Sequence, residues 1–117
     1  MRTNLRPIAM ASIVATAVAL SCVNAVALSE ADIIGNWCGT ESNYAINRTS
    51  MIVIRNSDNA RLAFDVLKIE NRTATLLVQW RLQGRVGGTE FGEFSADGLK
   101  MVQLPNARGP RREFRRC

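Results

Sequence analysis

Cysteine and the carboxylates carry most of the potential chemistry in this 117-residue chain, because the sequence contains no histidine. Without histidine, a serine or cysteine nucleophile lacks its commonest activating base. Cys38 and Cys117, the cysteines outside the first 27 residues, do not by themselves complete a tetrahedral zinc site. The composition therefore predicts a protein that is not an enzyme and that holds no metal and no cofactor.

A pair of glutamates is the remaining candidate for acid–base chemistry. Glu90 and Glu93 flank Phe91 in a glycine-rich stretch. A spacing of three along a strand puts two side chains on opposite faces, unless Gly92 forms a bulge. We therefore expect both glutamates to be solvated strand charges.

Residues 1–27 have the pattern of a secretory signal peptide. Two arginines near the N-terminus precede an uncharged run over residues 8–20, and Ala25-Val26-Ala27 has the small residues of a cleavage site. Cleavage after Ala27 leaves residues 28–117 as one small domain in the periplasm or outside the cell. An uncleaved anchor is one alternative, although a spanning helix needs about 20 apolar residues. A lipoprotein modified at Cys22 is the other.

Export leaves Cys38 and Cys117 as the only cysteines of the domain. Two cysteines in an oxidising compartment pair by default. Their bond would close a loop of nearly the whole domain, and chain entropy gives such a loop about 4 kcal/mol. Two free thiols are the alternative. A domain this short buries a thin core, so we expect the bond to matter for folding.

The alternation of apolar and polar residues predicts an all-β domain. The clearest strand covers residues 73–83, where Leu76, Val78 and Trp80 share one face. Other strands are expected at residues 37–40, 43–48, 51–55, 61–70, 89–95, 99–104 and 111–117, with a bulge near Val66 and a hairpin at Asp97-Gly98. Seven or eight short strands in succession indicate a small antiparallel up-and-down meander that closes, or nearly closes, into a barrel. A β-sandwich is the alternative.

The start of the domain resembles the lipocalin/calycin family. A helical turn over residues 29–34 leads into Gly35-Asn36-Trp37. In that family such a tryptophan plugs one end of an antiparallel barrel, and an arginine near the last strand packs across it. The resemblance implies this role for Trp37, with Arg115 or Arg116 stacked on its indole. The layout of Trp-Cys at the front and Arg-Arg-Cys at the back is also similar to small exported proteins of Gram-negative bacteria.

Aromatic residues form the first candidate binding site. Trp37, Trp80 and Phe91 offer ring surfaces, and a cavity lined by Leu76, Val78, Trp80 and Phe91 would suit a small apolar ligand. The alternative places both tryptophans in the core, Trp37 as an end plug and Trp80 in the inward-facing row.

Arginines at the C-terminus form the second candidate. The last ten residues carry five arginines against one glutamate, whereas residues 28–117 as a whole carry thirteen basic and ten acidic residues. Exposed, the cluster would favour anionic lipid or acidic glycan through Arg111, Arg112, Arg115 and Arg116. A solvated basic edge strand is the alternative. Nucleic acid is not expected, since no recognition motif is present.

Two functions follow from these candidates. The first is an exported binding module that takes a small apolar ligand or caps a protein partner, as small exported barrels that inhibit hydrolases do. The second is an envelope-surface protein held to anionic lipid or glycan by its arginine cluster.

Overall fold

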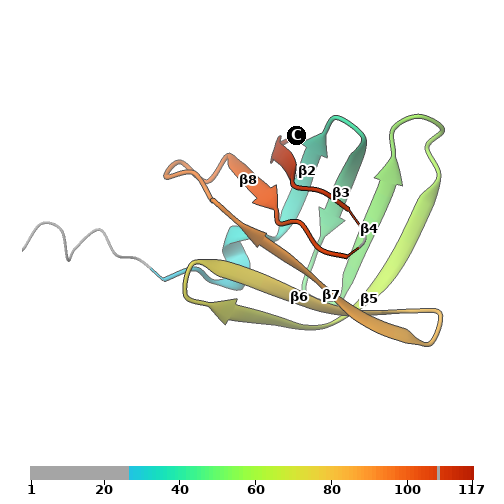
Figure 1. The fold of residues 1–117 in the computed structure, drawn as a ribbon, viewed down its shortest axis with the longest axis horizontal. Helices are drawn as coiled ribbons and strands as arrows, with labels where there is room; N and C mark the ends of the chain where they lie inside the picture. Colours follow the sequence, from blue (N-terminus) through green and yellow to red (C-terminus); the bar gives the residue numbers. More distant parts are fainter. Residues whose placement is uncertain (1–26, 108) are drawn as a thin grey trace, which may run out of the picture.

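The structure is a computed structural model that describes residues 27–107 and 109–117 (Figure 1). The predicted signal peptide and the alternative lipidation site at Cys22 lie outside the described residues. Within them, a short 3₁₀ helix precedes eight strands: η1 (Glu30–Asp32), β2 (Gly35–Gly39), β3 (Ser42–Ile46), β4 (Ser50–Arg55), β5 (Arg61–Arg72), β6 (Thr75–Leu82), β7 (Arg85–Gly92), β8 (Lys100–Gln103) and β9 (Arg112–Arg116).

The strands form a closed barrel in which each strand pairs antiparallel with the next and β9 pairs with β2. Figure 1 shows β2 and the C-terminal strand side by side. In this seam Trp37 lies opposite Arg116 and Cys38 lies opposite Arg115. The predicted all-β meander and its closure are confirmed, and the sandwich alternative is wrong.

The core lies inside the barrel because alternate residues of every strand face inward. Inward rows run across paired strands, as where Trp37 meets Tyr44, Tyr44 meets Val53, and Val78 meets Thr89. The buried apolar residues of the core come from the residue that follows η1 and from all eight strands. They are Ile33, Trp37, Tyr44, Ile46, Met51, Phe64, Leu76, Val78, Trp80, Phe91, Met101 and Phe114.

The predicted bulge in β5 is present. Pairing with β6 jumps from Val66 opposite Trp80 to Lys68 opposite Gln79. Leu67 is the extra residue, and it is 45% exposed. After it, Ile69 lies opposite Val78 in the inward row. The bulge thus explains why the apolar pattern of this segment changes phase.

β7 begins at Arg85 rather than at the predicted residue 89, and it ends at Gly92. Gly87 and Gly88 therefore lie inside the strand, whereas the predicted strand began after them. Gly87 lies opposite Trp80, and a Cβ at Gly87 would stand 2.6 Å from the indole. The glycine makes room for the ring within a continuous strand, so it is a packing position.

The Asp97-Gly98 turn lies where the sequence predicts it, and a second tight turn, not predicted, joins β6 to β7. Gln83 and Gly84 both have positive φ, 51° and 81°, which suits a two-residue hairpin turn between β6 and β7. Gly98, in the Asp97-Gly98 turn, has φ of 75°. There the Ser95 N–H donates to the Lys100 carbonyl and closes the β7–β8 connection.

Candidate functional site

Trp37 packs between the chain that leaves η1 and the last strand, a contact referred to below as the Trp37 plug. Its ring is fully buried, and its Nε1 donates to the Ile33 carbonyl at 2.8 Å. The Arg116 guanidinium lies 4.0 Å from the indole centroid. The same guanidinium donates to the carbonyls of Ile34 and Gly98 at 2.6 and 3.2 Å. Of the two candidate arginines, Arg116 makes the stacking contact, and the protein itself covers the Trp37 ring.

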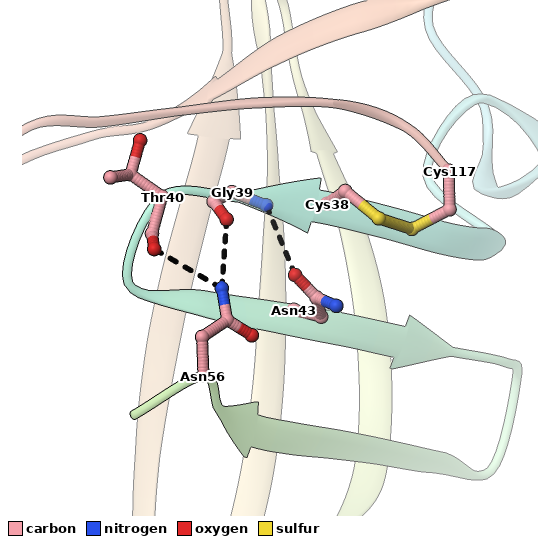
Figure 2. Close-up of a disulfide and its surroundings, with 6 residues drawn as sticks. All are labelled: Cys38, Gly39, Thr40, Asn43, Asn56 and Cys117. Atoms are coloured by element: carbon pink, nitrogen blue, oxygen red, sulfur yellow. Dashed lines mark hydrogen bonds between the residues drawn. A yellow bond between two sulfur atoms is a disulfide. The ribbon is translucent and has the colours of Figure 1, made fainter. Parts of the chain in front are cut away.

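The disulfide links β2 to the residue that follows β9 (Figure 2). It joins Cys38 to Cys117, as predicted, across 5.1 Å between their Cα atoms. Next to it, the Asn56 side-chain amide donates to the Gly39 carbonyl at 2.9 Å and to the Thr40 carbonyl at 3.2 Å. These contacts hold the β2–β3 turn against the chain that leaves β4.

A cavity of about 330 Å³ lies away from the Trp37 plug, toward the ends of β4 and β8 and the starts of β5 and β7. Its volume is near the lower end for ligand pockets, which span roughly 300–1,000 Å³. The mouth of a barrel is a common place for such a site. The lining residues are Tyr44, Met51, Val53, Leu62, Phe64, Trp80, Gly87, Gly88, Thr89, Gln103, Asn106 and Ala107.

Aromatic rings form much of this lining. The Phe64 and Trp80 ring centroids are 4.8 Å apart in an edge-on arrangement, a favourable geometry for an aromatic pair. Leu62, at 50% exposure, contributes an apolar side chain that also faces solvent. The cavity therefore offers a guest apolar surface that is partly open to water.

Polar side chains in the lining are few and engaged. The Trp80 Nε1 donates to the Thr89 hydroxyl at 2.9 Å, and the Tyr44 hydroxyl donates to Gln103 Oε1 at 2.8 Å. Burial raises the pKa of Tyr44 to about 12, although the positive charge of Arg112 opposes the shift. Tyr44 therefore stays a neutral hydrogen-bond donor at physiological pH.

The aromatic candidates from the sequence separate in space. Trp80 lines the cavity. Trp37 and Phe91 are fully buried elsewhere in the core, and Phe91 packs edge-on against Tyr44 at 5.5 Å between centroids. Leu76 and Val78 are also buried outside the cavity lining.

The arginine candidates also separate. Arg111 pairs with Glu93 at 2.7 Å and with Glu113 at 2.9 Å. Arg112 pairs with Glu41, and Arg116 is used at the Trp37 plug. Arg115 is exposed and makes no ion pair with any described residue. Arg108 lies outside the described residues.

The carboxylate candidates have separate partners. Glu90 accepts a hydrogen bond from the Thr75 hydroxyl, while Glu93 is held by Arg111. Over residues 27–107 and 109–117, no three His, Cys, Asp or Glu side chains gather where they could hold a metal ion. No helix in the same ranges has the length and apolar character needed to cross a membrane.

Trp80 is the one lining residue that the sequence predicted as a site residue, and Tyr44, Leu62, Phe64 and Gln103 are among those that it did not predict. Leu62 and Phe64 were on one face of a predicted strand, but which end of the barrel they reach depends on closure. Gly87 was the residue that could have indicated the site from the sequence, because a glycine inside a strand often marks a close approach by another group. Here the approaching group is Trp80.

Comparison of the chain with protein-family models, with curated proteins and with solved structures finds no match. The eight-stranded antiparallel barrel is compatible with the fold that the resemblance to lipocalins implies.

Proposed function

We propose that this protein is an exported, non-enzymatic binding module that takes an apolar group into the cavity beside Trp80. The group belongs either to a small ligand or to a protein partner. The observation that carries the proposal is the cavity of about 330 Å³ with Phe64 and Trp80 in its wall and half-exposed Leu62 at its solvent side.

The physical support is the burial of apolar surface. An apolar guest against Phe64 and Trp80 gains roughly 25 cal/mol for each Å² removed from water. Thr89 and Gln103 can orient a polar atom on the guest, because each hydroxyl or amide retains further hydrogen-bonding capacity. The resemblance to lipocalins adds a family in which barrel mouths hold apolar ligands.

The test is a fluorescence titration with N-phenyl-1-naphthylamine, an apolar probe that brightens when it leaves water. We expect saturable binding to the unchanged protein. Leu62→Arg should weaken it by at least about tenfold, which corresponds to 1.4 kcal/mol, because a cation is placed in the lining. Leu67→Arg is the matched control, since Leu67 is similarly exposed on the same strand but lies in the bulge. Equal weakening by both substitutions, or no saturable binding, would refute the proposal.

An anionic surface partner for Arg111, Arg112, Arg115 and Arg116 is the second candidate function. It has less support, because three of the four side chains are engaged by acids or by the plug. Binding to vesicles with anionic lipid that is lost in Arg115→Ala, with naphthylamine binding unchanged, would favour it over the cavity.

A further inference from the structure

β7 has an edge that no described strand covers. All its residues from Arg85 to Gly92 pair with β6 on one side. On the other side only Phe91 and Gly92 pair with β8. In Figure 1 the start of β7 lies at its hairpin with β6, away from β8, and only its end approaches β8. The barrel thus closes through the last part of β7 and leaves the first part open.

The open edge presents backbone groups that pair with no described residue. The Glu90 carbonyl accepts from the Leu104 N–H, so it points to the β8 side. Backbone groups on a strand alternate between its two edges, and Val86 and Gly88 therefore point to the same side as Glu90. Val86 is 68% exposed and Gly88 is also exposed. Their N–H and C=O groups are available to an incoming strand.

The same edge forms a wall of the cavity. Gly87, Gly88 and Thr89 of β7 line the cavity, and so do Gln103 at the end of β8 and Asn106 and Ala107 in the loop that follows it. The two glycines present no side chain between the edge and the cavity. A strand laid along Val86 and Gly88 would continue the sheet, and alternate side chains would face the cavity.

We propose that this edge takes an extended segment of a partner protein as an added strand, with one apolar side chain seated beside Trp80. This inference rests on the proposed function, and it assigns the apolar group that enters the cavity to a protein partner and not to a small ligand. Added strands gain affinity from main-chain hydrogen bonds and gain specificity from pockets for alternate side chains. β7 supplies both within a few residues.

Charge indicates an acidic partner segment. Arg85 starts β7, and Arg81 lies opposite Val86 on β6. Both are exposed, and neither forms an ion pair with the described part of the chain. A second copy of this chain would bring the same two cations to the same edge, which disfavours self-pairing. An extended segment with an acidic residue beside its apolar one is complementary.

The test selects random heptapeptides displayed on phage against the oxidised protein and counter-selects on Val86→Pro. Proline removes the outward N–H of Val86 without breaking a bond to β6, so the ladder should survive. Val86→Thr is the matched control, because it keeps the N–H. We expect peptides with an apolar residue and a nearby acid that lose about tenfold in affinity on Val86→Pro and little on Val86→Thr.

Two further measurements separate strand addition from simple insertion of a side chain. N-methylation of the peptide's edge amides should abolish binding, and peptide should slow hydrogen exchange at the Val86 and Gly88 amides. Arg85→Glu should weaken acidic peptides several-fold and leave versions with glutamine in place of the acid unchanged.

Absence of any peptide that distinguishes wild type from Val86→Pro would overturn the inference, as would peptides that tolerate N-methylation. A dimer that dissociates on Val86→Pro would also overturn it, in favour of a second copy. If no such peptide is found while the unchanged protein still binds naphthylamine, the cavity works and only the added strand has failed. Loss of naphthylamine binding in the unchanged protein would count against the proposed function itself.

Discussion

Arg116 is the residue on which one end of the barrel depends. Its guanidinium covers the Trp37 ring and also reaches the carbonyls of Ile34, Asp32 and Gly98. A planar, always-charged group with five donors can do both, whereas lysine cannot. One side chain thus connects the 3₁₀ helix, the β8 hairpin and the last strand, which explains why it is not available to a surface ligand.

Tyr44 is the residue with the clearest titration behaviour, because it is the only tyrosine in the sequence. Absorbance at the tyrosinate band should give a midpoint near pH 12 in the folded protein, since burial raises the pKa of Tyr44 to about 12. In denaturant the midpoint should return to about 10. A folded midpoint near 10 would mean that Tyr44 is not buried.

The same shift makes a statement about stability. The folded pKa of Tyr44 is raised, so its contribution is fully present below about pH 10 and is lost as pH rises toward 12, where the unfolded chain ionises first. The free energy of unfolding should therefore fall between those values. Tyr44→Phe removes this part of the fall, and urea unfolding at several pH values would measure it.

The β6–β7 hairpin is the element that sets the cavity wall. Trp80 lies across from Gly87, and its indole occupies the space where a side chain would be. Gly88 is less constrained, because a Cβ there would meet the end of the flexible Leu77 side chain at 3.0 Å. The two neighbouring glycines therefore differ in what they tolerate.

This difference predicts unequal effects of alanine on the hairpin. Gly87→Ala should cost about 1–3 kcal/mol and should shift the fluorescence of Trp80, since the ring must move from the new methyl group. Gly88→Ala should change both much less. Urea unfolding and tryptophan emission compare the two, and equal effects would show that the ring does not fill the Gly87 position.

Closure between β2 and β9 is the feature that makes the whole molecule one unit. It joins the first and last of the described strands, and the Cys38–Cys117 bond spans 79 residues at the same seam. Long loops gain most from a cross-link in chain-entropy terms. The disulfide and the backbone ladder therefore act on the same contact.

We expect removal of the Cys38–Cys117 disulfide to cause a large loss of stability in a domain this small. Cys38→Ser with Cys117→Ser should lower the free energy of unfolding by about 4 kcal/mol, a large share of the 5–15 kcal/mol of typical domains. Thermal and urea unfolding of the double variant provide the measurement. Unchanged protein treated with reductant should match it, and unaltered melting in both would show that closure does not need the bond.

Local pattern was enough to predict the strands, the bulge near Val66, the Asp97-Gly98 turn and the cysteine pair. The alternation of apolar and polar residues and the turn residues depend on a residue's own type and on its near neighbours in the chain. The cysteine pair needed no spatial information, because only two cysteines remain after the predicted cleavage. Even there the start of β7 was missed, because the need for Gly87 arises from Trp80 on the facing strand.

Apart from the cysteine pair and the closure of the barrel, tertiary structure decided which residues far apart in the chain contact one another. It assigned the Trp37 contact to Arg116 rather than Arg115, since only one of two successive residues on a strand can face inward. It put Trp80 in the cavity wall and Phe91 in the core, and it paired Arg111 and Arg112 with acids from distant parts of the chain. Such choices follow from barrel closure and register, which bring together residues that no local pattern relates.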